Sequence, residues 1–162
     1  MEYNISNLPL NIHDKSPNVD VEKLYNELKN KLQGEVRFDD GTRAMYATDS
    51  SNYRQVPIGV VIPRNLQDIM ITTNICHKYG APLLSRGGGT SLAGQCCNVA
   101  VVMDMSKYYN KVISINKDLK LASVEPGIVL DELNKQAKKV RSDIRSGSFN
   151  TYTLYLGWYD RK

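Results

Sequence analysis

The sequence has few cysteines, and their spacing does not suit a metal. Only Cys76, Cys96 and Cys97 occur, and the last two are adjacent. Zinc and iron–sulfur sites need cysteines at short, fixed intervals, and no such interval occurs here. We therefore expect no metal site, and we expect reduced thiols, as is usual for a cytoplasmic protein.

The sequence also lacks a long apolar run and a basic stripe. No run approaches the roughly 20 residues that a membrane-spanning helix needs. The first residues, among them Glu2 and Asn4, lack the charged-then-apolar pattern of a secretion signal. Net charge is +4, but lysine and arginine are not gathered as in proteins that bind nucleic acid. These absences favour a cytoplasmic location, no transmembrane segment and no nucleic-acid partner.

What is present fits one globular domain. The 162 residues are 41% hydrophobic and 23% charged, which allows a real core. Residues 1–19 are polar and contain Pro9 and Pro17, so we expect a flexible N-terminal lead. The folded part should begin at Asp20, which is suited to cap a helix.

Hydrophobic spacing and capping residues predict the elements that follow. Helices are expected from Asp20 to a stop at Gly34, from Asn65 to Gly80, and from Ile128 to about Lys139. Strands are expected over 35–38, 59–62, 82–85, 98–105, 112–115 and 121–124, with a turn at 39–41. The last two strands flank 116–118 and are expected to form a hairpin. The strand–helix–strand order from 59 to 85 favours a parallel pair. The sequence thus predicts an α+β fold, a small mixed β-sheet with flanking helices.

The most distinctive stretch is glycine-rich and covers residues 82–95, PLLSRGGGTSLAGQ. Glycine lets backbone approach a ligand closely, and successive exposed N–H groups suit an anion. Thr90, Ser91 and Gln95 add side-chain donors, and Arg86 adds a cation suited to phosphate. The stretch predicts a loop that holds the diphosphate of a cofactor; a simple glycine-rich turn between two strands is the alternative.

Two common glycine motifs do not fit this stretch. A Walker A loop ends in Gly-Lys-Ser/Thr, and the loop has no lysine. The fingerprint G-x-G-x-x-G fails as well: counted from Gly87 its sixth position is Leu92, and counted from Gly89 its third position is Ser91. The loop is therefore neither a P-loop nor a Rossmann loop.

The string RGGGTSLAGQ resembles the pyrophosphate loop of the FAD-linked oxidases, the vanillyl-alcohol-oxidase or PCMH-type flavoproteins. Its flanks are similar too: GVVIPR at 59–64 resembles the family's strand–Pro–helix opening, and VVMDMS at 101–106 and ASVEPG at 122–127 resemble its later strands. The resemblance runs from about Arg37 to Val140. It is closest to the branch of D-lactate dehydrogenase, the glycolate oxidase flavin subunit and D-2-hydroxyglutarate dehydrogenase. Residues 38–64 look most like the large members that are fused to an iron–sulfur domain.

The resemblance implies that residues 20–139 form a partial PCMH-type FAD-binding domain, the first part of a two-subdomain fold. It implies that the loop contacts the pyrophosphate and that three further residues lie near the adenosine. The implied cofactor-binding residues are Pro63, Arg86, Gly87, Gly88, Gly89, Thr90, Ser91, Leu92, Ala93, Gly94, Gln95, Pro126 and Gly127. Relatives that bond FAD covalently carry histidine in this loop, where this chain has Thr90, so we expect non-covalent FAD.

The segment from Met45 to Val56 has two open interpretations. In the resembled family it ends near the flavin, which would place Asp49, Tyr53 and Arg54 beside the ring system. Its polar composition favours the other interpretation, that these are solvated loop residues.

The resemblance implies a reaction in which a 2-hydroxy acid of the D-lactate, glycolate or D-2-hydroxyglutarate type reduces FAD. The cofactor carries the chemistry and the protein supplies placement. No catalytic base can be named in this chain. We expect the FAD-binding portion of such an oxidoreductase, inactive as a truncated chain. A non-enzymatic nucleotide- or flavin-binding module and an inert, unstable fragment are the alternatives.

The last residues, 140–162, do not resemble the family, which continues with motifs like Y-G-x-x-F-G-P-D-P-S and C-T-L-G-G-M-I-G-N. One set of synonymous codons for these residues, read one base later, encodes YGQIFGPDPSTHTHCTLGGMIG. Most first and second codon positions are fixed, so free codon choice does not produce such a string. We expect residues 140–162 to be an out-of-frame tail of a frameshifted gene. A genuine aromatic strand over 151–159 is the alternative.

Overall fold

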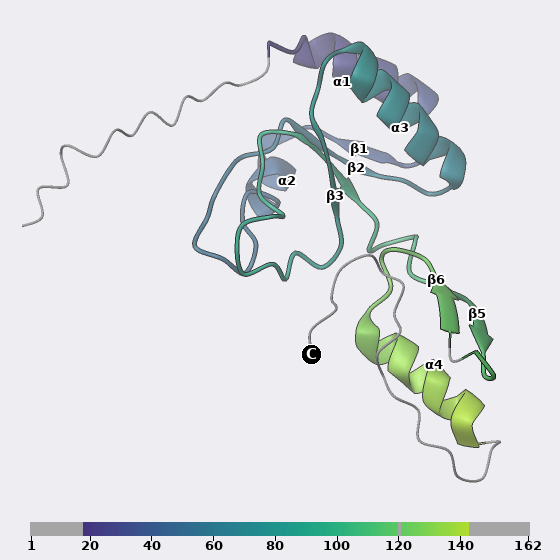
Figure 1. Cartoon of the computed structure of the whole chain (residues 1–162). Coiled ribbons are helices and arrows are strands. Elements are labelled where there is room, and N and C mark those ends of the chain that lie inside the picture. Colours follow the sequence, from purple (N-terminus) through teal and green to yellow (C-terminus); the bar gives the residue numbers. More distant parts are fainter. Residues whose placement is uncertain (1–17, 120, 143–162) are drawn as a thin grey trace, which may run out of the picture.

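The structure is a computed structural model, which describes residues 18–119 and 121–142. Our expectations for residues 1–17 and 143–162 lie outside the described residues. The described chain has two parts, a four-stranded sheet with its helices and a smaller hairpin with one helix (Figure 1).

The larger part is built on a mixed sheet. Its strands are β1 (Glu35–Arg37), β2 (Gly59–Ile62), β3 (Leu83–Arg86) and β4 (Val101–Asp104), in the order β1-β2-β4-β3. β1 is antiparallel to β2, and both β2 and β3 are parallel to β4. The expected parallel direction of β2 and β3 is therefore correct, but the two are not a pair, because β4 lies between them. The mixed sheet with helices confirms the predicted fold class.

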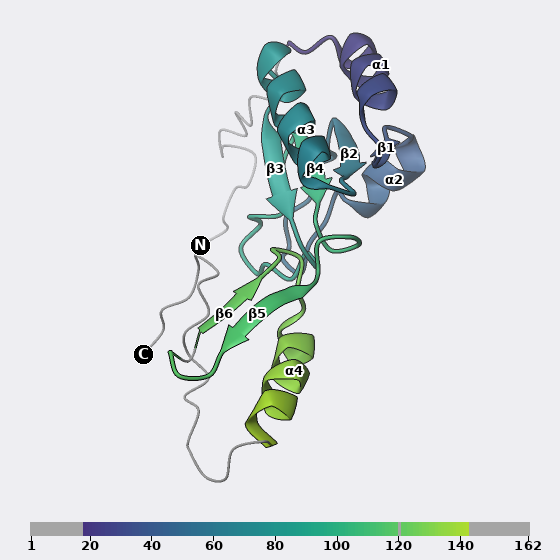
Figure 2. The same cartoon turned by 90° about the vertical axis from the view of Figure 1, so that its right-hand side faces the viewer.

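Helices α1 (Val21–Lys31) and α3 (Leu66–Lys78) lie side by side on this sheet (Figure 2). Successive strand residues point to opposite faces, so β2, β3 and β4 each contribute to two apolar clusters. One cluster joins the helices to the sheet and includes Leu24, Leu28, Val36, Val61, Ile75 and Val101. The other lies on the opposite face and contains Val60, Ile62 and Val102, with Tyr46, Leu84 and Tyr108 packed against it.

The helix caps are those that the sequence predicts. The Asp20 carboxylate accepts from the Lys23 N–H at 3.1 Å, and the Asn65 side chain accepts from the Asp68 N–H at 2.9 Å. Gly80 follows α3 with φ +64°, a backbone conformation that glycine adopts without steric cost.

Two local predictions are wrong. Residues 39–41 are not a turn but the start of helix α2 (Asp40–Met45), because the Asp39 carboxylate caps the Thr42 N–H at 2.9 Å. Gly34 does not end α1, which stops at Lys31. Glycine is needed at 34 for close packing, since a Cβ there would lie 2.3 Å from the Ile62 carbonyl oxygen.

The smaller part is the hairpin of β5 (Val112–Asn116) and β6 (Leu121–Val124), followed by α4 (Leu130–Ser142). The hairpin is antiparallel, as predicted. Gly127 joins it to the larger part: its N–H donates to the Tyr109 carbonyl at 2.7 Å. A Cβ on Gly127 would lie 2.2 Å from the Met105 carbonyl oxygen, so this junction admits only glycine. Across the described ranges, no helix has the length and apolar character to cross a bilayer.

Candidate functional site

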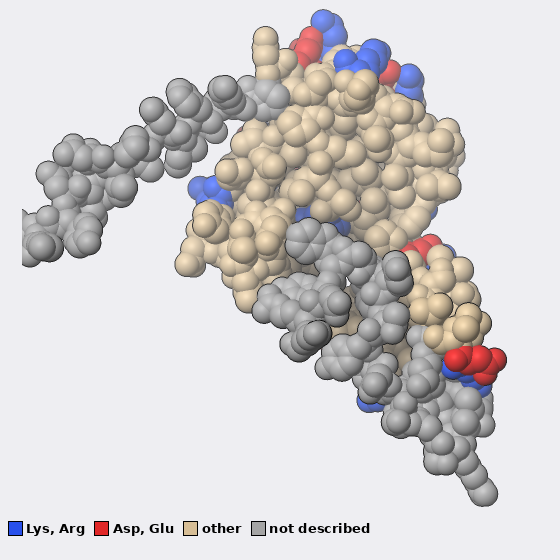
Figure 3. Space-filling view, in the orientation of Figure 1, with Lys and Arg blue, Asp and Glu red and all other residues tan. Residues whose placement is uncertain are grey.

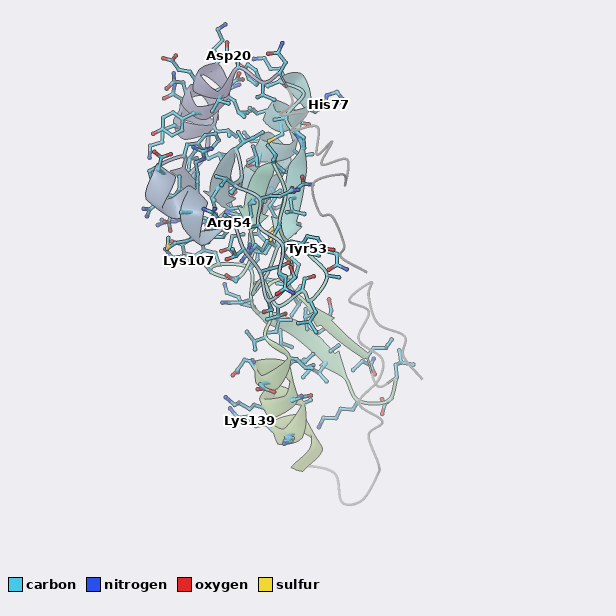
Figure 4. The ribbon with its side chains drawn as sticks, turned by 90° about the vertical axis from the view of Figure 1, so that its left-hand side faces the viewer. Asp20, Tyr53, Arg54, His77, Lys107 and Lys139 are labelled. Atoms are coloured by element: carbon cyan, nitrogen blue, oxygen red, sulfur yellow. The ribbon has the colours of Figure 1, made fainter. Side chains whose placement is uncertain are left out.

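The glycine loop, Gly87–Gln95, begins where β3 ends. In open sheets with parallel strands, ligands bind outside the carboxyl ends of the strands. The first residues after β3 and β4 are Gly87 and Met105, and the Met105 N–H donates to the Arg86 carbonyl at 2.9 Å. Figure 4 shows Tyr53, which contacts this loop, far from Asp20 and His77 at the opposite end of the larger part.

Two loop glycines are required by the protein itself. Gly89 has φ +68°, and a Cβ there would lie 2.3 Å from an Arg86 guanidinium nitrogen. Gly94 has φ +78°, and a Cβ there would lie 2.7 Å from the Tyr53 ring. Side chains at either position would be strained and would displace a neighbour. These two glycines fix the shape of the loop.

The other two glycines are not required by the protein. A Cβ on Gly87 would meet nothing within 4 Å, and one on Gly88 would make an ordinary 3.7 Å contact with Thr90. Neither has a positive φ. Since the fold leaves room for a side chain at both positions, packing within the protein does not explain why both residues are glycine. Close approach of a ligand to the backbone does explain it.

The hydrogen bonds of the loop leave its first part open. The Ser91 hydroxyl donates to the Gln95 side-chain oxygen, and the Gln95 N–H returns a bond to Ser91 Oγ at 3.3 Å. Within the part of the chain that the structure describes, the N–H groups of Gly87, Gly88 and Thr90 donate to no protein acceptor. The predicted donor Ser91 thus gives its hydrogen to Gln95, while the preceding backbone offers several adjacent N–H groups, an arrangement suited to an anion.

The exposed side chains of the loop are those of Thr90, Leu92, Ala93 and Gln95. Leu92 is 81% exposed, so its side chain is available for contact with a ligand. Of the remaining predicted residues, Pro63 is fully buried behind β2, Pro126 is exposed, and Gly127 is buried in the junction with the hairpin. Residues 86–95 are continuous in the chain, and Pro63 lies at the same edge of the sheet as the start of the loop, because β2 and β3 are both parallel to β4.

A second segment, Tyr46–Arg54, is fastened to the loop. The Ser50 N–H donates to the Gly89 carbonyl at 3.2 Å, and the Cys96 N–H donates to the Asp49 carboxylate at 3.3 Å. Hydrogen bonds from Ser51 lower the pKa of Asp49, which stays ionised as a backbone acceptor. Tyr53 is 64% exposed with its ring against Gly94. The segment thus lies beside the glycine loop.

Arg86, the residue before the loop, hydrogen-bonds to the Tyr46–Arg54 segment and to Cys96, the residue after the loop. Its Nη1 donates to the carbonyls of Tyr46 and Cys96, each at 3.2 Å, and its Nη2 donates to the Thr48 carbonyl at 2.9 Å. The guanidinium also lies over the Tyr46 ring, 5.2 Å from its centroid. Three of the five guanidinium donors are therefore occupied by backbone oxygens.

A buried acid supports the same place, and the sequence did not single it out. Asp104, the last residue of β4, is 7% exposed and accepts from the Tyr46 hydroxyl at 2.5 Å and from the Ser106 N–H at 2.7 Å. Burial and then this bond raise the pKa of the Tyr46 phenol far above its ordinary value. An acid at the end of an apolar strand was the available signal in the sequence. No group of three or more potential metal ligands occurs among residues 18–119 and 121–142.

Comparison with known proteins gives a family match over more than half of the chain. The model of a family described as "FAD binding domain" matches residues 57–154. Among curated proteins, D-2-hydroxyglutarate dehydrogenase of Escherichia coli is 32% identical over 108 residues, which are 65% of this chain and 11% of the relative. The mitochondrial cytochrome-type D-lactate dehydrogenase of Kluyveromyces lactis is 34% identical over 116 residues, 69% of this chain and 20% of the relative.

Solved structures share the fold. Alkyldihydroxyacetonephosphate synthase matches with a TM-score of 0.64 at 23% identity, over 74% of this chain and 25% of that protein. p-Cresol methylhydroxylase also matches with a TM-score of 0.64, at 19% identity and the same coverage. The chain thus has the PCMH-type FAD-binding fold, and it spans only about a tenth to a fifth of the curated relatives named above.

Proposed function

Because the chain belongs to the FAD-binding domain family, we propose that its glycine loop, Gly87–Gln95, holds the diphosphate of FAD. One observation carries this assignment: Gly87 and Gly88 have space for a side chain and have none. Their N–H groups and that of Thr90 lack acceptors among the described residues. Several adjacent N–H groups on backbone without side chains form a good site for a diphosphate.

The same loop supports non-covalent binding. The exposed Thr90 offers a hydroxyl, which cannot form the bond that a histidine forms with a flavin in the covalent relatives. Leu92, exposed beside it, offers apolar contact to the cofactor. Pro63, Pro126 and Gly127 remain proposed for the adenosine side; Pro126 has an exposed surface, whereas buried Pro63 and Gly127 would act through the backbone they shape.

We further propose that the chain is the FAD-binding portion of an oxidoreductase that acts on a 2-hydroxy acid. The relatives are named for D-2-hydroxyglutarate, D-lactate and glycolate. Bound FAD would accept the hydride in such a reaction. Residues 1–162 supply the placement of its diphosphate, and we expect no turnover from these residues by themselves.

The test is to purify the chain and to measure flavin binding and flavin reduction separately. Binding of FAD with a dissociation constant in the micromolar range or below, followed by titration fluorescence, would support the FAD site. Absorbance of the bound flavin is then followed during anaerobic addition of each 2-hydroxy acid. Bound but unbleached FAD is our expectation. Rapid bleaching would show a self-sufficient enzyme, and equal affinity for ADP and FAD would favour a general nucleotide-binding module.

If the chain is folded and does not bind FAD, the glycine loop is not an FAD diphosphate site. If the chain instead aggregates and yields no cooperative unfolding transition, the inert-fragment alternative is correct. Far-ultraviolet circular dichroism with a thermal scan separates these two outcomes, since only a folded chain melts cooperatively.

Three features of the parent protein are proposed with it. A cytoplasmic location is supported by the free thiols of Cys76, Cys96 and Cys97. A fused iron–sulfur domain is supported by the similarity of residues 38–64 to the fused members.

An out-of-frame origin of residues 140–162 is supported by their shifted translation, and the family match to residue 154 supports the alternative, a genuine tail. The nucleotide sequence from codon 138 onward decides the last two.

A further inference from the structure

We propose that Arg86 is a positioning residue: it joins the Tyr46–Arg54 segment to the glycine loop and does not neutralise the diphosphate. This inference rests on the proposed function where it concerns FAD. Its structural half concerns contacts within the chain alone. From its charge and its position in the sequence, Arg86 would be expected to bind the anion directly, and the structural role proposed here is different.

The direction of the guanidinium carries the argument. Both Nη1 hydrogens are given to carbonyls, those of Tyr46 and Cys96, and Nη2 donates to the Thr48 carbonyl. A bidentate contact with phosphate needs two parallel donors on one edge of the guanidinium. Every edge that includes Nη1 is already occupied. The remaining edge, between Nε and Nη2, faces Gly89, where a Cβ would lie 2.9–3.0 Å from the Cζ and Nε atoms.

The second argument is that the contacts of Arg86 join segments far apart in the sequence. Tyr46 and Thr48 are 40 and 38 residues from Arg86. The Tyr46 ring lies beneath the guanidinium, and its hydroxyl is held by the buried Asp104. The arginine therefore lies between the sheet and the segment that runs beside the loop. A lysine, with one tetrahedral ammonium group, cannot reach three carbonyls set around a plane.

The two roles predict different behaviour for substitutions. If Arg86 acted on the diphosphate through its charge, lysine would replace it tolerably, and Arg86→Met would reduce the salt dependence of FAD binding because one ionic contact is lost. As a positioning residue, Arg86→Lys and Arg86→Met should be equally damaging. Both should weaken FAD binding about tenfold or more through lost hydrogen bonds, and both should leave the salt dependence as in the wild type.

Amide hydrogen exchange in the FAD-free chain tests the contacts directly. The Ser50 N–H donates to Gly89 and the Gln55 N–H donates to Ala47, so both report on the attachment of the segment. We expect both amides to exchange at least about tenfold faster in either Arg86 variant. The amides of α3, which do not contact Arg86, serve as the internal control and should keep their rates.

A second pair of variants keeps the charge of Arg86 and moves its guanidinium. Gly89→Ala places a methyl group 2.3 Å from Nη2 and must displace it. Gly80 has a similar φ, +64° against +68° for Gly89, and a Cβ there would meet nothing within 4 Å. Gly80→Ala therefore introduces the backbone strain without a clash and is the matched control. We expect Gly89→Ala, and not Gly80→Ala, to speed the exchange of Ser50 and Gln55 as the Arg86 variants do. These variants serve also if the Arg86 variants fail to fold.

Each outcome decides one of the two proposals. Normal FAD binding by Arg86→Lys, or a reduced salt dependence in Arg86→Met, would overturn the positioning role. Unchanged exchange of Ser50 and Gln55 in the Arg86 variants and in Gly89→Ala would overturn it as well. If the wild type binds no FAD, the proposed function fails, and the exchange measurements still decide whether Arg86 holds the segment.

Discussion

Tyr46 donates its phenolic hydrogen to the buried carboxylate of Asp104 across 2.5 Å. The bond joins the end of α2 to the end of β4, directly under the guanidinium of Arg86. Asp104 is 7% exposed, and its carboxylate has one other described donor, the Ser106 N–H. Only these two hydrogen bonds from described residues stabilise the buried carboxylate. A buried carboxylate that loses a donor is costly, which makes this bond a sensitive point of the fold.

Tyr46→Phe should lower the free energy of unfolding by about 1–3 kcal/mol at pH 7, because Asp104 loses a hydrogen bond and its charge stays buried. Urea denaturation with unchanged slope measures the loss. Tyr53→Phe is the matched control, since the Tyr53 side chain is 64% exposed and its hydroxyl makes no bond to another described residue. Equal stability of Tyr46→Phe and wild type would contradict the account.

The same bond gives the stability a dependence on alkaline pH. The pKa of Tyr46 in the fold lies above 10.0, so the folded chain keeps a proton that the unfolded chain releases. The stabilisation is complete below pH 10 and declines as the pH rises above it. Tyr46→Phe should therefore flatten the decline, which denaturation between pH 9 and 11 would measure. An identical slope in the variant would exclude Tyr46 as its source.

Glu35 should set part of the acid stability. Its carboxylate accepts from Lys107 at 2.5 Å and from Tyr108 at 2.9 Å, joining β1 to the segment after β4. The bonds from Lys107 and then Arg37 lower the pKa of Glu35 from 4.5 to about 2. The contribution is thus present above pH 4.5 and is lost as the pH falls toward 2.

Glu35→Gln should cost about 1 kcal/mol at pH 7 and little at pH 2.5, which denaturation at a series of pH values would show. Lys107→Met should reduce the same acid dependence partly, because Arg37 and Tyr108 remain. If wild type and Glu35→Gln lose stability in parallel from pH 6 to 2.5, other carboxylates are responsible.

Gly127→Ala should uncouple the hairpin part from the sheet part. The added methyl group would lie 2.2 Å from the Met105 carbonyl oxygen and 2.5 Å from that of Tyr109, and backbone must move to admit it. We expect a loss of about 1–3 kcal/mol and faster amide exchange in β5 and β6. Gly41→Ala, in helix α2 with its nearest atom at 3.4 Å, is the control and should not destabilise. If the β5 amides of Gly127→Ala exchange as slowly as in the wild type, Gly127 does not hold the hairpin to the sheet.

Gly88→Ala should separate binding from stability. The position is exposed, has no positive φ and offers 3.7 Å to its nearest atom, so the free energy of unfolding should stay within about 0.5 kcal/mol. The methyl group would occupy space that the proposed diphosphate needs, and FAD affinity should fall at least about tenfold. Fluorescence titration measures this fall, again with Gly41→Ala as the control. Full affinity in Gly88→Ala would place the diphosphate elsewhere.

The sequence predicted well those features that depend on neighbouring residues. Asp20 and Asn65 cap their helices, Gly80 follows α3 with a left-handed φ, and the hairpin after Val112 has its turn in the expected place. A cap needs only residues three positions apart, so its signal is local. The apolar runs likewise located β2 and β4, each buried along its length.

Features that depend on distant residues could not be predicted in this way. Gly34 and Gly127 are glycines because of carbonyls at Ile62 and Met105, which no local pattern reveals. The insertion of β4 between β2 and β3 is likewise a matter of topology. For Arg86, the sequence identified a cation beside an anion site, but not the three carbonyls that occupy it. The start of α2 was missed because Asp-Asp-Gly suits a turn and a capped helix equally.

Figure 3 shows a broad face with few charged side chains between the charged groups near α1 and those near the hairpin. Some of this face lies on the four-stranded sheet and its helices. Both apolar clusters there contain residues of β2 and β4. These central strands come together only after some 40 residues of intervening chain, Val60 being paired with Val102. Helix caps and the hairpin need no such closure.

The glycine loop depends on the same long-range closure. Its attachments reach back 39 residues from Gly89 to Ser50 and 47 residues from Cys96 to Asp49. Contacts between distant residues form late in folding, because closing the chain between them costs entropy that local contacts do not. We therefore expect the loop to acquire its shape among the last events of folding. A ligand that recognises that shape would bind only molecules in which these long-range contacts have formed.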